Sequence, residues 1–416
     1  MLSTLDSLLL LLLALPIPLR YRLLPVEGTP YWLFGILFLL IFGNIFLSLY
    51  PPRKISKYIE QIKTLIVWLV LIIVVGGVTV TAIVDRSKTA PQLGVHDIIL
   101  QQEGAMRYLL EGKNPYKETY FGTLLESWNY DEQGKPAVNP ALYHFVMPPW
   151  YLLFPFAFYF LSVPFFGFFD GRMALLFCLL GMLILLWRWF ADKRIARVAM
   201  ILAVLAPGIV DYFIEGRSDT FALFWLIWSL YLLDRRKLLL SAVMFGLAVT
   251  SKQTIWFAVP FYLVYVWIGI KTKVRGRVSA IILVFAVVAA LTLPFLLWDP
   301  KAFVDSTVFY LSGNTSYGYP ISGYGLGMVL YSLGVIRDIH EYYPFILWQA
   351  VFGLPVIMGS LWFLIQKPGI VRLLAGYGAS LGVIWYMSRY FNNSHIGYLA
   401  VVFLLAILKQ WDEQKV

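Results

Sequence analysis

Charged residues are scarce in this sequence. Asp, Glu, Lys and Arg make up 13% of its 416 residues, whereas a soluble domain has about 25%. Together with a hydrophobic share of 60%, this scarcity excludes an ordinary soluble globular protein. Cysteine is nearly absent, and the lone Cys178 excludes an internal disulfide without indicating a compartment.

Two kinds of motif are missing as well. No glycine-rich loop precedes a Lys-Ser or Lys-Thr pair, so the sequence has no phosphate-binding loop for a nucleotide. His, Cys and acidic residues do not cluster at the spacing of a metal site, and we expect neither a metal nor a cofactor. One alternative stays open, because Asp211, Glu215 and Asp219 recur every four residues and their carboxylates suit a divalent ion.

Long apolar runs are abundant instead. Runs of roughly 17–25 apolar residues recur along the chain, each long enough to cross about 30 Å of hydrocarbon. Continuous runs without alternation favour helices, which satisfy their own backbone hydrogen bonds in lipid. We therefore predict a single all-α transmembrane domain over residues 1–416. Its twelve or so spans are residues 5–19, 30–50, 64–84, 171–191, 196–214, 219–233, 238–250, 253–270, 277–297, 343–366, 370–388 and 396–410.

The net charge of +10 lies largely in short loops between these spans. Six segments hold more than half of the 33 Lys and Arg but few of the 23 acids. Cytoplasmic loops of membrane proteins have this bias, so we place the six segments and both termini in the cytoplasm. The bias explains the net charge without a nucleic-acid partner. The segments are residues 51–63, 192–197, 234–237, 271–277, 367–372 and 409–416.

Two longer loops then lie outside, at residues 85–170 and 298–342. In the first, residues 98–111 form an amphipathic helix with Glu103, Arg107 and Glu111 on its polar face, and such a helix lies in the membrane surface. Gly112 is expected to end this helix. The apolar run 148–166 is predicted to dip into the outer leaflet without crossing, because a crossing would put the later loops on the wrong sides. Residues 325–336 are interpreted in the same way.

The polar residues nearest the spans fall on the outer side, which predicts an outward-facing site. Asp97 begins the amphipathic helix and has two interpretations: a helix N-cap, or a general base whose pKa a helix N-terminus keeps low. Glu103 is explained by ion pairs along its helix, with a substrate contact as the alternative.

Cations on the outer side suggest a phosphate site. Lys252 lies in a polar turn between short spans and is expected to bind an anion rather than to extend its ammonium to the surface. Arg389 and His395 bracket a tight turn where both groups suit a phosphate, with interfacial anchoring as the alternative. Asp219 and Arg217 form another polar turn, which a mutual ion pair explains equally well.

Four elements on the outer side follow one another along the chain. They are His96-Asp97 before Gly112-Lys113-Asn114-Pro115-Tyr116, Tyr143 before Met147-Pro148-Pro149-Trp150, Pro207 before Gly216-Arg217-Ser218-Asp219, and Gly246 before Lys252. In this order they resemble the GT-C superfamily, and in particular bacterial polyprenyl-phosphate-mannose-dependent mannosyltransferases. The likeness covers residues 64–270 well and the remainder only in hydropathy. Tyr143 stands farther from the prolines than in the family pattern, and the spans before residue 64 have no counterpart in a minimal version of the fold.

This resemblance implies an inverting glycosyltransferase of the cytoplasmic membrane. It would transfer a sugar, with mannose expected, from a polyprenyl-phosphate donor to an extracytoplasmic glycan, glycolipid or protein. Asp97 would be the catalytic base, and Lys252, Arg389 and His395 would bind the donor phosphate. Further substrate contacts are expected at His96, Glu103, Tyr116, His144, Arg217 and Asp219. The alternative is a transporter or lipid flippase with an outward cavity, although the sequence lacks the internal repeat typical of transporters.

Overall fold

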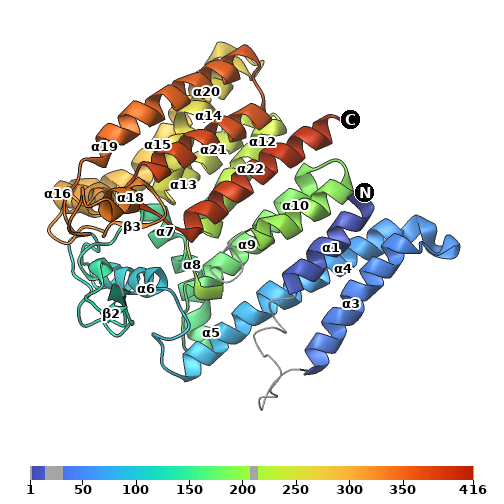
Figure 1. The fold of residues 1–416 in the computed structure, drawn as a ribbon, viewed down its shortest axis with the longest axis horizontal. Coiled ribbons are helices and arrows are strands. Elements are labelled where there is room, and N and C mark those ends of the chain that lie inside the picture. Colours follow the sequence, from blue (N-terminus) through green and yellow to red (C-terminus); the bar gives the residue numbers. More distant parts are fainter. Residues whose placement is uncertain (1, 15–30, 133, 207–213, 416) are drawn as a thin grey trace.

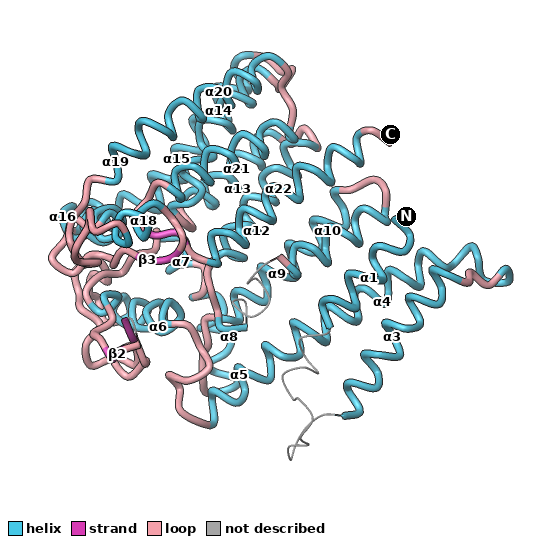
Figure 2. The backbone as a smooth tube through the Cα atoms, viewed as in Figure 1, coloured by secondary structure: helices cyan, strands magenta, loops and turns pink. Residues whose placement is uncertain are grey.

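The computed structural model describes residues 2–14, 31–132, 134–206 and 214–415. These residues are mostly helical, as predicted, and loops rather than sheets connect the helices (Figure 2). The described strands form two small sheets. β1 (Asp131–Glu132) pairs antiparallel with β2 (Lys135–Pro136), and β3 (Ser322–Gly323) pairs parallel with β4 (Tyr390–Phe391).

Every predicted span contains a helix in the structure. In chain order the helices are α1 (Leu2–Ala14), α3 (Tyr31–Leu49), α4 (Ile59–Leu71) continued by η2 (Ile72–Gly77) and α5 (Val78–Lys88), α9 (Arg172–Trp189), α10 (Lys193–Leu205), α12 (Asp219–Asp234), α13 (Leu238–Val249), η4 (Gln253–Ala258) continued by α14 (Val259–Ile268), α15 (Val274–Trp298), α19 (Phe345–Trp348) continued by η6 (Gln349–Gly353) and α20 (Leu354–Gln366), α21 (Ile370–Tyr386) and α22 (Asn393–Glu413). The turn η1 (Arg53–Tyr58) precedes α4.

Length separates these helices into two groups. Among the described residues, 7 helices are long and apolar enough to cross a membrane, which confirms a multi-pass membrane protein. Several others are shorter: α13 has 12 residues and so a length of about 18 Å, less than the hydrocarbon core. The count of about twelve crossings therefore stays a prediction. α12 lies in the core and is buried on nearly all sides, whereas α15 and α20 bury few of their apolar side chains, as lipid-facing helices do.

The connecting elements gather at one end of the bundle. They are α6 (Asp97–Leu110), η3 (Pro140–Leu142), α7 (Pro149–Leu153), α8 (Phe156–Phe166), α16 (Pro300–Val304), η5 (Asp305–Phe309), α17 (Tyr310–Ser312) and α18 (Leu326–Ser332). Figure 1 shows α6, α16 and α18 together at this end, whereas α1 begins and α22 ends at the opposite end. This arrangement agrees with two loops on one side of the membrane and both termini on the other.

The helix predicted at residues 98–111 lies at Asp97–Leu110. Ile99, Ala105 and Met106 are buried on its inner face, and Gly112 follows with a φ of 73°, a conformation that favours glycine at the end of a helix. The run 148–166 forms α7 and α8, which together are long and apolar enough to cross a membrane. Because α7 packs against α6, this segment begins at the outer end, and its predicted dip without crossing stays a prediction.

The N-terminal helices are held by buried charges. In what we call the inner ion cluster, Asp6 of α1 contacts Lys63 of α4 at 2.8 Å and Arg197 of α10 at 2.6 Å, and all three side chains are at most 1% exposed. Arg197 also reaches Glu60 at 2.7 Å. The sequence places Lys63 and Arg197 at the ends of two cation-rich segments, whereas in the structure they lie within α4 and α10 and share a buried acid. Their acidic partner lies far away in the sequence and does not stand out there.

Candidate functional site

Most of the predicted site residues line one cavity at the end of the bundle that carries α6. This outer cavity has a volume of about 390 Å³. α6, the loop after it, the start of α12, the turn after α13 and the turn before α22 all contribute to its wall. The predicted residues found in it are His96, Asp97, Arg217, Asp219, Lys252 and His395.

Asp97 is held by two side chains. Its Oδ1 lies 2.6 Å from Nδ1 of His96, and its Oδ2 accepts a hydrogen bond of 3.1 Å from the amide of Asn139. Burial alone would raise the pKa of the Asp97 carboxyl. The charge of His96 and the hydrogen bonds from His96 and Asn139 have the larger, opposite effect and lower the pKa to about 2. The carboxylate is therefore ionised at neutral pH and available to accept a proton.

Capping does not account for Asp97. The N-cap of α6 is His96, whose backbone is extended and whose Nδ1 lies 3.3 Å from the backbone N–H of Ile98. One nitrogen cannot both accept from Ile98 and donate to Asp97. The contact with Asp97 is much the shorter, so we assign the Nδ1 proton to it. Asp97 is the first residue of the helix, and its carboxylate lies near the positive end of the helix dipole.

Lys252 and Asp219 form an ion pair on the wall of the cavity. Their Nζ and Oδ1 atoms are 2.5 Å apart, and the side chains are 21% and 8% exposed. The alternative pairing of Asp219 with Arg217 was wrong, because Asp219 begins α12 and faces the turn after the short helix α13. Arg217 instead lies 3.8 Å from Glu215. Asp211, the third acid of the open metal alternative, falls outside the described residues.

His395 lies in the first turn of α22. Its Nδ1 lies 2.7 Å from Oδ1 of Asn392 and 3.1 Å from the backbone N of Asn392, contacts that belong to a capping box. The ring packs edge-on against Trp385, with 4.3 Å between centroids. These contacts fix the ring at the cavity, where Nε2 is the remaining nitrogen for a ligand.

Arg389 lies elsewhere than predicted. Its guanidinium donates to the backbone carbonyls of Tyr319, Glu341 and Ile339 in the second outer loop, the last two at 2.7 and 2.9 Å. The side chain is buried and is not part of the wall of the outer cavity. Burial lowers the pKa of Arg389 to about 10, which still leaves it charged. Its position therefore supports a structural role for Arg389 rather than phosphate binding.

Glu103 and Tyr116 also lie apart from the outer cavity. The sequence predicts an ion pair between Glu103 and Arg107 of the same helix. In the structure Glu103 pairs instead with Arg86 of α5 at 2.6 Å. Burial raises the pKa of Glu103, against the opposing effect of Arg86. Arg86 also contacts Asp170 at 2.8 Å, so the three side chains join α5, α6 and the start of α9. Tyr116 is buried among aromatic rings, and its hydroxyl donates to the carbonyl of Met147 at 2.9 Å.

His144 faces a different hollow, next to the outer cavity. Its ring lies 5.3 Å from that of Tyr310, and Tyr310 belongs to the wall of the outer cavity. Sequence reasoning missed the residues of the first loop that close this wall, namely Trp128, Tyr130 and Asn139. Asn139 precedes a proline as helix caps often do, and it caps η3, but nothing in the sequence indicates its bond to Asp97.

The sequence model of Glycosyltransferase family 87 matches residues 145–408. The chain belongs to this family. No curated protein matched the chain. The prediction of a membrane glycosyltransferase is thereby confirmed, and the alternative of a transporter or flippase loses its support.

The match to family 87 covers only some of the residues that line the outer cavity. It includes Asp219, Lys252 and His395, whereas His96 and Asp97 precede its first residue. Both parts meet in space, because the loop after α6 packs onto the elements that carry the matched residues. His96 illustrates this, since its backbone N–H donates to the carbonyl of Glu215, just before α12, at 2.7 Å.

Proposed function

We propose that the protein is an inverting glycosyltransferase that moves a sugar, mannose in our proposal, from a polyprenyl-phosphate carrier to an acceptor hydroxyl. One observation supports this most directly. The ionised carboxylate of Asp97 and the ammonium of Lys252 line the same cavity at one end of an apolar helix bundle. Transfer from a lipid phosphate needs both groups, one to accept a proton and one to stabilise the departing phosphate.

Asp97 acts as the general base. The acceptor oxygen attacks the anomeric carbon, and its proton passes to the carboxylate. The bond between that carbon and the phosphate oxygen breaks, and its electron pair stays on the phosphate. Attack opposite the leaving group inverts the carbon. Because a carboxylate with a pKa of about 2 is a weak base, it takes the proton late, once bond formation has made the hydroxyl acidic.

Lys252 stabilises the leaving phosphate. Asp219 keeps the ammonium at the wall of the cavity, and His395 and Arg217 lie on the same wall to contact the remaining phosphate oxygens. Charge-assisted bonds of this kind are the strong ones, and they gain strength as negative charge develops on the oxygen. Arg389 has no part in this scheme.

In our proposal the outer cavity faces the extracytoplasmic side of the cytoplasmic membrane. The support is the excess of Lys and Arg in the loops at the opposite end of the bundle. Lys135→Cys and Lys273→Cys, each in a Cys178→Ser background, test the orientation with an impermeant maleimide on intact cells. Labelling is expected at 135 alone, and labelling at 273 alone would reverse the orientation.

The reaction is tested with the full-length protein in nanodiscs. Polyprenyl-phosphate mannose is supplied with a mixture of cell-envelope glycans and glycolipids, and released polyprenyl phosphate is measured. We expect release by the wild-type protein and at least 10²-fold less by Asp97→Asn. Release that is equal in the two proteins would remove the proposed mechanism, and no release from any polyprenyl-phosphate sugar would remove the donor class.

A further inference from the structure

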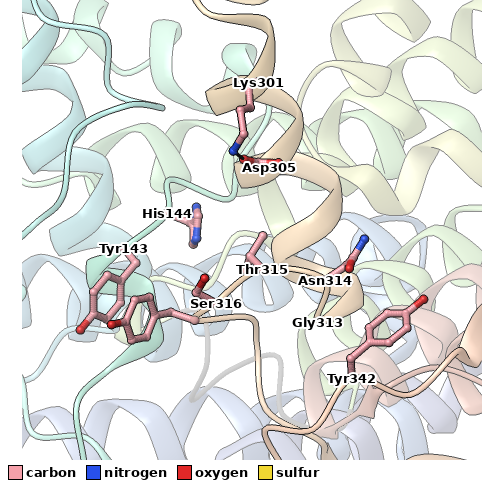
Figure 3. Close-up of a pocket in the computed structure, with 10 residues that line it drawn as sticks. Tyr143, His144, Lys301, Asp305, Gly313, Asn314, Thr315, Ser316 and Tyr342 are labelled. Carbon is pink, nitrogen blue, oxygen red and sulfur yellow. Dashed lines mark hydrogen bonds and ion pairs between the residues drawn. The ribbon is translucent and has the colours of Figure 1, made fainter.

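A second hollow lies beside the outer cavity and has not been assigned a role. We call it the tyrosine groove; its volume is about 580 Å³. Tyr143 and His144 of the first outer loop form one side, and the loop of residues 313–317 with Tyr342 forms the other (Figure 3). Lys301 and Asp305 close one end (Figure 3).

Aromatic rings give the groove flat apolar surfaces. The rings of Tyr143 and Tyr317 stack face to face, with 3.7 Å between centroids and 4° between planes. Tyr317 and Tyr342 are both 52% exposed, so part of each ring is open to the groove. Stacked tyrosines hold a rigid platform at low entropic cost, because each ring has only two side-chain torsions.

Polar groups surround this platform. Asn314, Thr315 and Ser316 follow one another in the loop, and Thr315 Oγ1 is buried without a hydrogen-bond partner among the described residues. Burial lowers the pKa of His144, so its ring is neutral at pH 7; Nδ1 lies 3.4 Å from Oγ of Ser306, which leaves Nε2 for a ligand. An amide, two hydroxyls and a neutral imidazole suit a ligand that itself both donates and accepts.

The charges in the groove cancel. Among the described residues that line the groove, the charged side chains are Lys301 and Asp305. Lys301 Nζ lies 2.6 Å from Asp305 Oδ2. The pair adds no net charge to the groove, so it gives neither an anion nor an amine a preference there. The groove therefore favours a neutral ligand with many hydroxyls and an apolar face, which is the chemistry of a sugar ring.

The groove and the outer cavity share a wall. Gln101, which lines the outer cavity, donates from its amide to the carbonyl of His144 at 2.8 Å. Arg389 supports the loop between the two spaces. Gly313 packs against its guanidinium, and the backbone carbonyl of Tyr319 accepts a hydrogen bond from it. The ring of His144 in the groove also lies 5.3 Å from that of Tyr310 in the outer cavity, so the two spaces adjoin.

We propose that the tyrosine groove is an acceptor subsite that binds a neutral oligosaccharide, whose terminal hydroxyl enters the outer cavity. This inference rests on the proposed function and narrows the acceptor to a glycan, free or attached to a larger carrier. A sugar ring stacks on the outer face of Tyr317, whose other face rests on Tyr143, and Asn314, Ser316 and His144 bond its hydroxyls.

Binding without turnover tests the subsite separately from the reaction. The full-length Asp97→Asn protein in nanodiscs, without lipid donor, is titrated into fluorescently labelled neutral oligosaccharides of mannose, glucose, galactose, arabinose or N-acetylglucosamine. We expect at least one to bind, and Tyr317→Ala or Asn314→Ala to weaken that binding about ten-fold, the effect of one lost stacking or hydrogen-bonding partner. Tyr317→Phe, which keeps the ring, and Tyr50→Ala, at the other end of the bundle, should bind like the parent.

Two outcomes overturn the proposal: no oligosaccharide of the panel binds, or Tyr317→Ala binds as tightly as the parent. The proposed function fails differently. If a glycan binds in the groove while no polyprenyl-phosphate sugar is consumed by the wild-type protein, the donor assignment is wrong and the glycan subsite stands.

Discussion

The two ends of the bundle both bury charged side chains, but they use them differently. In the inner ion cluster, Asp6, Lys63 and Arg197 are at most 1% exposed, and each acidic oxygen of Asp6 has its own cation. In the outer cavity, Asp97 and Lys252 are about one-fifth exposed, and each keeps a face toward open space. The first arrangement is closed, whereas the second leaves room for a ligand.

This difference limits the rule that charge within a membrane protein marks function. The inner ion cluster, with Glu60 included, has zero net charge. It joins α1, α4 and α10 and so attaches the N-terminal helices to the rest of the bundle. Burial alone therefore does not separate the two ends. What separates them is whether a charged group still faces a cavity after its protein partners are counted.

The largest effect is expected from Asp97→Asn in the outer cavity. The amide keeps the shape and can still accept from Asn139, but it cannot take a proton. Turnover should fall by about 10²–10⁴-fold, the usual contribution of a general base, with donor affinity little changed. Turnover is measured as polyprenyl phosphate released, and donor affinity by tryptophan fluorescence.

Glu111→Gln is the matched control, because Glu111 is an exposed acid at the other end of the same helix and pairs with the exposed Lys113 at 2.7 Å. It should keep near-normal turnover. Near-normal turnover in Asp97→Asn would instead leave the cavity without its base, and Asp219 would be the next carboxylate to test.

The reverse pattern is expected when the inner ion cluster is broken. Arg197→Met leaves the buried carboxylate of Asp6 with one cation instead of two, which costs about 3–5 kcal/mol in the free energy of unfolding. Thermal unfolding in detergent should show the loss, while the folded fraction keeps its donor affinity. Arg194→Gln, on the same helix but 48% exposed, is the control and should change little. Loss of donor affinity in folded Arg197→Met would show that the two ends are coupled.

The sequence predicted some of this contrast and missed the rest, for identifiable reasons. Apolar runs predict helices because lipid leaves the backbone few choices, and Asp97, Asp219 and Lys252 stand out because they interrupt such runs. The partners of Arg389 and Arg197 could not be predicted. Arg389 binds backbone carbonyls, which every residue has, and Arg197 binds an aspartate on a helix 191 residues away.

Lys252 and Arg389 give the next comparison. Lys252 faces the outer cavity, whereas the guanidinium of Arg389 donates to three backbone carbonyls away from it. Lys252→Met should weaken donor binding about ten-fold, since one charge-assisted bond is worth about 1.5–3 kcal/mol. Arg389→Met should leave donor affinity within about two-fold but loosen the second outer loop and lower the thermal midpoint, because three carbonyls lose their donor. Titration of a fluorescent polyprenyl-phosphate analogue measures the first effect. Equal losses of donor affinity would return Arg389 to the phosphate site.

The smallest effect concerns the pH dependence that His96 gives to Asp97. The ionised carboxylate is the active form, so activity is lost as pH falls through its pKa. With that pKa at about 2, kcat/KM of the wild-type enzyme should have no acid limb from Asp97 between pH 4 and 8. In His96→Gln the charge beside Asp97 is gone, and its pKa should rise toward the usual value of about 3.9. The variant should then retain about half of its plateau activity near pH 4 and nearly all of it above pH 5.

The same measurement separates two candidate bases. If Nε2 of His96 took the proton, with Asp97 merely orienting the ring, the wild-type enzyme would show an acid limb that belongs to the imidazole. His96→Gln would then abolish the limb together with most of the activity. An ionised aspartate predicts the opposite, a flat wild-type profile and an active variant whose limb lies at low pH. The contact of 2.6 Å between the two side chains fits either assignment, so the position of the limb decides which group accepts the proton.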